Sequence, residues 1–204
     1  MKQDLYSHRS NLIVAFHGCD KSVVERVVLQ QDNLIASTND YDWLGSGVYF
    51  WENNESRALK WAVEASKRPN SKIKEPAVIG AVIDLGYCMD LTDSKYLHEL
   101  KEAYDTLLKV LENLHQEVPQ NTGKTSDRLL RRLDCAVIEM AHDINEQSGE
   151  RAYDSVRGVF WEGKQLYPNA GFAEKNHIQI CVRNPNCIKG FFIPRTIDNR
   201  YLNP

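Results

Sequence analysis

Short runs of apolar, often β-branched residues predict a set of strands. The first run, 12–16 (LIVAF), ends at His17 and Gly18, and it predicts a buried strand that leads into a turn. Glycine, proline and asparagine residues separate the later runs, as is typical of turns. The pattern therefore predicts strands in the first and the last third of the chain. The later runs lie at 48–51, 78–85, 155–161, 178–182 and 188–193.

Apolar residues spaced three or four apart predict helices between these strands. The segment 21–30 has this spacing, and Asp20 is in position to cap its first turn. The segment 56–67 has the same spacing, because its alanine and leucine residues fall on one helical face. The chain therefore begins with strand, helix, strand and helix.

Two longer amphipathic segments follow the third strand. The segment 95–116 carries a leucine-rich stripe, with Asp93 or Ser94 as its cap, and the segment 127–145 carries a second stripe. The loop 119–125 separates the two segments. We expect the two helices to pack as a hairpin. Interleaved helices and strands, followed by strands alone, indicate an α+β fold rather than a doubly wound parallel sheet.

Length and composition fit one domain that spans 1–204, with the helical hairpin inserted at about 93–147. The 25 basic and 28 acidic residues give a net charge of −3, which argues against the general basic field of a dedicated nucleic-acid binder. No segment has the ~20 apolar residues of a membrane span, and the N-terminal MKQDLYSHRS lacks the apolar stretch of a secretory signal. Five scattered cysteines favour reduced thiols over disulfides or a zinc site. We therefore expect a cytoplasmic protein.

The standard nucleotide-binding loops are absent from the sequence. Gly45-Ser46-Gly47 precedes a predicted strand, whereas a Rossmann loop follows a strand and reads GxGxxG, and a P-loop reads GxxxxGK[ST]. His17 alone is typical of a core or turn histidine, and Tyr49 alone is typical of a strand. Their order along the chain is more informative: strand, His-Gly, helix, polar loop, Gly-x-Gly-x-Tyr-Phe, helix.

This order resembles the ADP-ribosyltransferase superfamily, in the histidine–tyrosine branch that poly(ADP-ribose) polymerases share with diphtheria-like toxins. The first motif is AFHGC at 15–19, and the second is LGSGVYFW at 44–51, which 56–61 continues. The strand at 178–182 (IQICV) lies where the family has its third motif residue, here Gln179. The resemblance implies a split antiparallel β-sheet and NAD as the ADP-ribose donor, without a metal.

The resemblance also implies a role for each motif residue. His17 would contact the adenosine ribose, the backbone of Gly18 would hold the nicotinamide carboxamide, and the ring of Tyr49 would stack on nicotinamide. Glycine permits close backbone approach, and an aromatic face attracts a planar cation. Trp61 would form a second wall, with a plain core tryptophan as the alternative. The full expected NAD-binding set is His17, Gly18, Gly47, Tyr49, Ser56 and Trp61.

Gln179 departs from the glutamate that many relatives carry. In those relatives the glutamate bonds the nicotinamide ribose and stabilises the oxocarbenium-like state as nicotinamide leaves. Glutamine keeps the hydrogen bond but loses the negative charge. Its presence argues for a single transfer rather than polymer elongation, and it leaves a weak or inactive transferase as an alternative.

The loop before the last motif corresponds to the segment that contacts the acceptor in the family. Glu162 is our candidate for the base that activates an acceptor, with Glu174 as a second candidate. The alternative for each is a solvated loop carboxylate. Tyr167 and Phe172 in the same loop are candidates for stacking on an acceptor ring. Arg157 lies in the preceding strand. The alternative to a functional role is that its side chain simply faces solvent.

Two local groups of basic residues are candidates for phosphate contacts. Charged residues opposite an apolar helix stripe more often simply face solvent. The first group comprises Arg128, Arg131 and Arg132, and the second comprises Lys189, Arg195 and Arg200.

The resemblance favours a mono-ADP-ribosyltransferase that acts as an intracellular toxin of a toxin–antitoxin or phage-defence system. RNA is the favoured acceptor, protein is a close second, and an antitoxin protein is an expected partner. Two alternatives are an NAD glycohydrolase and a module that binds NAD or ADP-ribose without transfer. A thiol hydrolase that uses His17 and Cys19 is disfavoured, because two side chains this close along an extended chain are poorly placed to act as base and nucleophile unless a turn brings them together.

Overall fold

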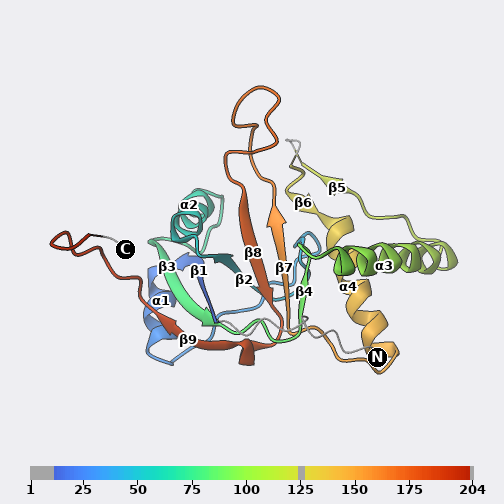
Figure 1. The fold of residues 1–204 in the computed structure, drawn as a ribbon, viewed down its shortest axis with the longest axis horizontal. Helices are drawn as coiled ribbons and strands as arrows, with labels where there is room; N and C mark the ends of the chain where they lie inside the picture. Colours follow the sequence, from blue (N-terminus) through green and yellow to red (C-terminus); the bar gives the residue numbers. More distant parts are fainter. Residues whose placement is uncertain (1–11, 124–126, 203–204) are drawn as a thin grey trace.

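The computed structural model describes residues 12–123 and 127–202. The N-terminal MKQDLYSHRS, on which the expectation about a secretory signal depends, lies outside the described residues, as does the end of the predicted 119–125 loop. Seven strands form one sheet in the order β4-β7-β8-β2-β1-β3-β9 (Figure 1). They are β1 (Ile13–Asp20), β2 (Val48–Glu52), β3 (Pro76–Ile83), β4 (Cys88–Asp90), β7 (Ser155–Phe160), β8 (His177–Val182) and β9 (Ile188–Phe192).

Neighbouring strands of this sheet pair antiparallel, except for the parallel pair β4 and β7. The fold is therefore mixed α and β with a mostly antiparallel sheet, which confirms the α+β prediction at this level. Within the described residues four α-helices accompany the sheet: α1 (Lys21–Val28), α2 (Glu55–Ser66), α3 (Ser94–Asn113) and α4 (Arg132–Gln147).

The caps predicted for two helices are present. The side chain of Asp20 accepts a hydrogen bond from the backbone of Ser22, and that of Asp93 accepts one from the backbone of Lys95. A side-chain oxygen in this position satisfies an amide that has no partner inside the helix.

The predicted helical hairpin is also present, with a ribbon that was not predicted. Helices α3 and α4 pack together in one apolar cluster. Between them β5 (Asn121–Thr122) pairs with β6 (Leu130–Arg131). Helix α4 therefore starts at Arg132 rather than at 127, and the Asn121 side chain accepts hydrogen bonds from the Leu133 and Asp134 amides in its first turn.

The prediction of a turn at His17 and Gly18 was wrong. Strand β1 continues through both residues to Asp20, because β3 pairs with it over its whole length. The short strand β4 was also missed. A run of three residues is too short for a periodic pattern to reveal.

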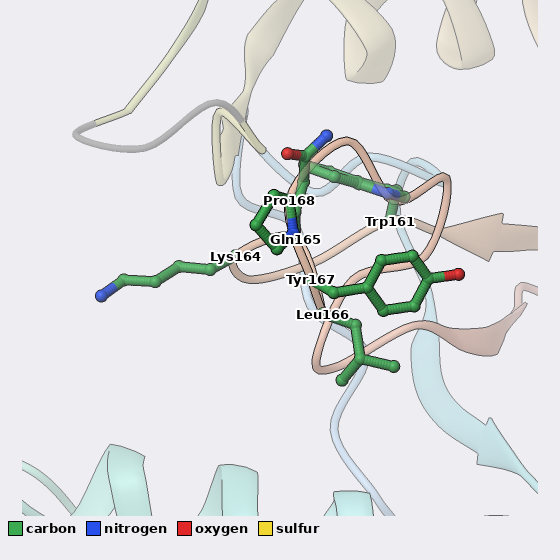
Figure 2. Close-up of a pocket in the computed structure, with 6 residues that line it drawn as sticks. All are labelled: Trp161, Lys164, Gln165, Leu166, Tyr167 and Pro168. Atoms are coloured by element: carbon green, nitrogen blue, oxygen red, sulfur yellow. The ribbon is translucent and has the colours of Figure 1, made fainter.

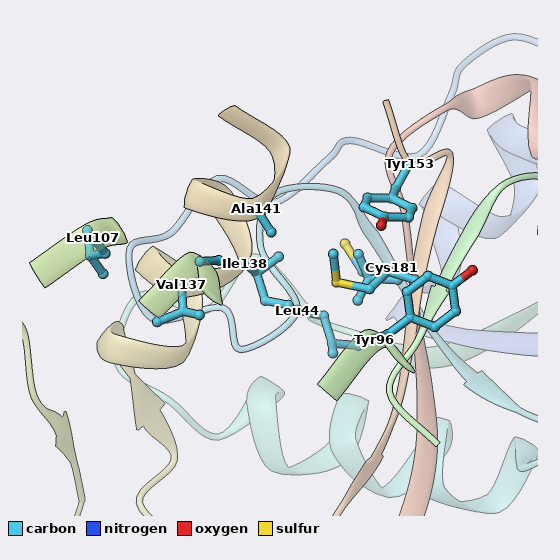
Figure 3. Close-up of a cluster of buried hydrophobic side chains, with 11 residues drawn as sticks. Leu44, Tyr96, Leu107, Val137, Ile138, Ala141, Tyr153 and Cys181 are labelled. Atoms are coloured by element: carbon cyan, nitrogen blue, oxygen red, sulfur yellow. The ribbon is translucent and has the colours of Figure 1, made fainter. Parts of the chain in front are cut away.

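Two layers of apolar side chains cover the sheet. One cluster joins α3 and α4 to the sheet, and Figure 3 shows Val137, Ile138 and Ala141 between Leu107 and Cys181. A second cluster draws on β1, β2, β3 and β8, and a third joins α1 to β1 and β3. Across the described ranges, no helix is both long enough and apolar enough to pass through a bilayer.

Candidate active site

Strand register brings two of the motif residues together. Phe16 of β1 is opposite Trp51 of β2, Trp51 is opposite Gln179 of β8, and Gln179 is opposite Gly158 of β7. Opposite residues in antiparallel strands point to the same face, and so do residues two apart on one strand. Tyr49 and Gln179 therefore lie on one face, which we call the Gln179 face.

His17 sits where β1 leaves β2. The paired residues of β1 and β2 are Ala15 with Glu52 and Phe16 with Trp51, after which β1 continues along β3. At this point Nδ1 of His17 lies 2.8 Å from the carbonyl oxygen of Tyr49. A side chain thus takes the place of a ladder hydrogen bond where β1 diverges from β2.

The ring of His17 lies on the opposite side of the sheet from Tyr49 and Gln179. Phe16, the residue before His17, lies on the same face as Tyr49 and Gln179. The ring of His17 contacts the ring of Phe50 on the other side, with centroids 5.8 Å apart. Burial lowers the pKa of His17, although the bond to the Tyr49 carbonyl opposes the shift. The ring is therefore neutral at pH 7, and Nδ1 carries the proton that the carbonyl accepts.

Tyr49 is fixed by the glycine turn that precedes it. Its hydroxyl donates to the carbonyl of Gly45 (2.8 Å) and accepts from the amide of Leu44 (3.0 Å). Gly45 adopts φ +77°, and a Cβ there would lie 2.8 Å from Glu139 Oε1. A Cβ on Gly47 would lie 2.5 Å from the sulfur of Cys181. Both glycines of the GSG motif are therefore required by close packing.

Gln179 is oriented by a tryptophan that the sequence did not single out. Trp43 Nε1 donates to Gln179 Oε1 over 2.6 Å, and the indole covers Gly158, where a Cβ would come within 2.7 Å of it. The amide oxygen of Gln179 is thus engaged, and its NH₂ group points away from Trp43.

Helix α2 supplies the next wall of the Gln179 face. It packs so closely on Gly18 that a Cβ there would lie 2.3 Å from the carbonyl oxygen of Ala58. Trp61 is half-buried against Trp51, with ring centroids 5.6 Å apart. Ser56 is exposed in the first turn of the helix, where its hydroxyl bonds Asn54.

A buried polar cluster lies beside Gln179, and of its members only Glu162 was a candidate from the sequence. Arg57 of α2 donates through one nitrogen to both carboxylate oxygens of Glu162, each at 2.7 Å. Their side chains are only 7% and 10% exposed. His177, two residues before Gln179 on β8, is 6% exposed, and its Nδ1 lies 3.8 Å from Glu162.

Several polar atoms of this cluster have no hydrogen-bond partner among the described residues. They are Nε and NH1 of Arg57, Nε1 of Trp51 and Nε2 of His177. Burial lowers the pKa of His177, so the ring is neutral at pH 7; its Nδ1 donates to the carbonyl of Lys175, and Nε2 keeps a lone pair. Buried polar atoms without partners are rare in proteins, and a bound ligand or water is a common reason for them.

Glu162 is therefore not a solvated loop carboxylate, whereas Glu174 is exposed. Tyr167 and Phe172 are 54% and 62% exposed at the tip of the loop 161–176, which extends from the ends of β7 and β8 away from the sheet (Figure 1). The loop also forms an open hollow, where Figure 2 shows Lys164 extending away from Tyr167.

The solvated alternative for Arg157 was wrong. Arg157 is 5% exposed and joins Glu52 of β2 (2.5 Å) to Asp90 of β4 (3.2 Å). It holds the strands together from the side opposite the Gln179 face.

The basic groups are mostly engaged in ion pairs. Arg131 pairs with Asp134, Arg132 with Asp40, and Arg200 with Asp198. All five cysteines lie among the described residues, where they are buried and form no disulfide. Within 12–123 and 127–202, no cluster of histidine, cysteine and carboxylate side chains is arranged to hold a metal ion.

Comparison with known proteins gives one distant relative. The chain is 29% identical to an uncharacterized protein of the archaeon Methanocaldococcus jannaschii over an alignment of 205 residues. The alignment covers 90% of this chain and 89% of the relative. No protein-family model matches the chain. No solved structure matches it.

Proposed function

We propose that this protein is an NAD-dependent mono-ADP-ribosyltransferase with a split-sheet ADP-ribosyltransferase fold. The observation that carries the proposal is the common face of Tyr49 and Gln179 on adjacent strands, at the point where β1 leaves β2 and His17 bonds the Tyr49 carbonyl. Three residues identified by motif thus come from three neighbouring strands.

The chemistry of this face suits cleavage of the bond between nicotinamide and ribose. An aromatic ring beside Gln179 attracts the cationic pyridinium of NAD. The NH₂ group of Gln179 donates to a ribose hydroxyl, while Trp43 fixes the amide. The partnerless atoms of Arg57, Trp51 and His177 offer further contacts to a polar ligand on the same face.

Glutamine in place of glutamate favours one transfer per acceptor over a growing polymer. We propose a macromolecular acceptor that meets the exposed tip of the loop 161–176, with RNA favoured and protein second. A cytoplasmic toxin of a toxin–antitoxin or phage-defence system, with an antitoxin protein as its partner, is the setting that fits this activity.

Two observations favour a second candidate, a module that binds NAD or ADP-ribose without transfer. Gln179 carries no charge, and the carboxylate of Glu162, the candidate base, is bound to Arg57. Both features reduce the negative charge available to an oxocarbenium-like state.

The test is incubation of the protein with NAD labelled in its adenylate half and a cell lysate that is then separated into RNA, DNA and protein. We expect label in one fraction, and its loss in Tyr49→Ala but not in the matched control Tyr201→Ala, which alters an exposed tyrosine. Label equal in the parent and in Tyr49→Ala would refute the proposed site. Without label, free nicotinamide identifies a glycohydrolase, and binding of NAD without nicotinamide release identifies the binding module.

A further inference from the structure

The strongest unexplained feature of the molecule is the buried cluster around Arg57. We propose that Arg57 and Lys175 form a binding site for a phosphoryl group, and that the carboxylate of Glu162 occupies this site in the present structure. The proposal rests on the proposed function for the origin of the phosphoryl group, which is either the diphosphate of NAD or the backbone of a nucleic-acid acceptor.

Two cations face the carboxylate of Glu162. Arg57 bonds both of its oxygens, and Lys175 Nζ lies 3.7 Å from Oε1. Lys175 also pairs with Glu64 at 2.9 Å. Two cations and two carboxylates leave this group neutral overall, so the group gains a net positive charge when the Glu162 side chain turns away. The negative oxygens of an incoming anion then take the place of the Glu162 carboxylate.

The donors of the cluster exceed what one carboxylate accepts. Arg57 uses one nitrogen for Glu162, while its Nε and NH1 remain without partners, and so does Trp51 Nε1. Guanidinium groups bind carboxylate and phosphate through the same parallel N–H bonds. A phosphoryl group presents more oxygens than a carboxylate, so it can satisfy donors that Glu162 leaves unpaired.

The parts of the site differ in how they are held. Arg57 lies on α2 and is fixed further by Trp51, with its guanidinium carbon 5.7 Å from the indole centroid. Glu162 lies just after the end of β7, in the loop 161–176. Rotation of the Glu162 side chain would free the guanidinium without any movement of α2.

The location links the site to the proposed reaction. Arg57 contacts Trp51, which is opposite Gln179 in the sheet. A phosphoryl group on Arg57 would therefore lie beside the residue expected to hold the ribose. This proximity fits either a substrate diphosphate or an acceptor phosphate.

The test measures binding of pyrophosphate, ADP-ribose and a single-stranded RNA oligonucleotide by calorimetry at constant ionic strength. Glu162→Gln frees Arg57 and is expected to tighten binding of the responding probe about tenfold, whereas Arg57→Gln weakens it at least tenfold. Arg57→Lys keeps the charge and should retain part of the affinity, even if Arg57→Gln folds poorly. Glu55→Gln, which removes an exposed carboxylate from the same helix, should change the affinity less than twofold.

In a ligand site, Glu162→Gln and Arg57→Gln should change the affinity in opposite directions. In a purely structural ion pair, either substitution would weaken binding. A response of pyrophosphate and ADP-ribose assigns the phosphoryl group to NAD, and a response of RNA alone assigns it to the acceptor. Weaker or unchanged binding of all probes in Glu162→Gln overturns the proposal. Nicotinamide release is measured separately, so a protein that binds phosphate without cleaving NAD would refute the proposed function and leave this site standing.

Discussion

Removing the hydroxyl of Tyr49 tests whether the glycine turn and the candidate site form one unit. In Tyr49→Phe the ring remains, but Gly45 loses a donor and the Leu44 amide loses its acceptor. Leu44 is fully buried, so water cannot replace the lost partner. Burial also raises the pKa of Tyr49 well above its usual value, so the hydroxyl is neutral and able to donate.

The expected loss follows from these two bonds. A buried amide without an acceptor costs about 1–3 kcal/mol, and the donated bond contributes about 1 kcal/mol. Gly45 keeps a weaker contact from the thiol of Cys181 at 3.5 Å. The free energy of unfolding should therefore fall by roughly 2–4 kcal/mol, which lowers Tm by roughly 5–15 °C in a protein of this size.

The assay is urea unfolding at pH 7, with Tyr201→Phe as the control because its ring is exposed and its expected change is below about 0.5 kcal/mol. In the same preparations NAD binding should weaken less in Tyr49→Phe than in Tyr49→Ala, since the stacking ring is retained. A free energy of unfolding for Tyr49→Phe within about 0.5 kcal/mol of the parent would refute the argument that Tyr49 holds the turn.

Three further predictions concern charge. Gln179→Glu should raise nicotinamide release roughly tenfold by placing a carboxylate beside the developing cation; equal or slower release would mean that charge is not limiting. Arg157→Met removes the cation between Glu52 and Asp90 and should lower the free energy of unfolding by about 3–5 kcal/mol in urea titrations, and a loss near zero would show that the buried network is dispensable. Burial, with a smaller effect of nearby Arg183, lowers the pKa of His142 to about 4, below its unfolded value of about 6.5. The unfolded chain therefore binds the proton first, and stability present above pH 6.5 should fall by roughly 3 kcal/mol between about pH 6.5 and pH 4; His142→Leu should flatten this slope, and an unchanged slope would exclude His142 as its source.

Local periodicity was sufficient for most of the fold, because most elements are long enough to show a repeat. The helices α1 to α3 and the strands β2, β3 and β7 to β9 lie within a few residues of their predicted positions. The errors come from pairing between distant segments. Strand β1 passes through the predicted turn at His17 because β3 supplies partners as far as Asp20, and the start of α4 is displaced by the β5–β6 ribbon.

The same distinction, between local patterns and contacts of distant segments, applies to the candidate site. His17, Gly18 and Tyr49 belong to continuous motifs, so the sequence could single them out as candidates, but it could not show that the ring of His17 lies on the other side of the sheet from Tyr49. Trp43 could not be found, since its bond to Gln179 joins residues 136 positions apart. The Arg57–Glu162 pair spans 105 positions, and an arginine on a predicted helix is usually solvated. The sequence placed Glu162 in the loop before the Gln179 strand, but it could not show that the side chain is buried.

The ion pair also changes what a catalytic role of Glu162 requires. To accept a proton from an acceptor, the carboxylate must first leave Arg57, because one Arg57 nitrogen donates to both of its oxygens. The movement that creates a base thus also opens the proposed phosphoryl site. Glu162→Gln separates the two consequences: if Glu162 is the base, transfer of labelled ADP-ribose to the macromolecule should fall at least about 100-fold, while nicotinamide release persists and phosphate affinity rises. If transfer remains at the parental rate, Glu162 serves to close the Arg57 site, and the base must be another group.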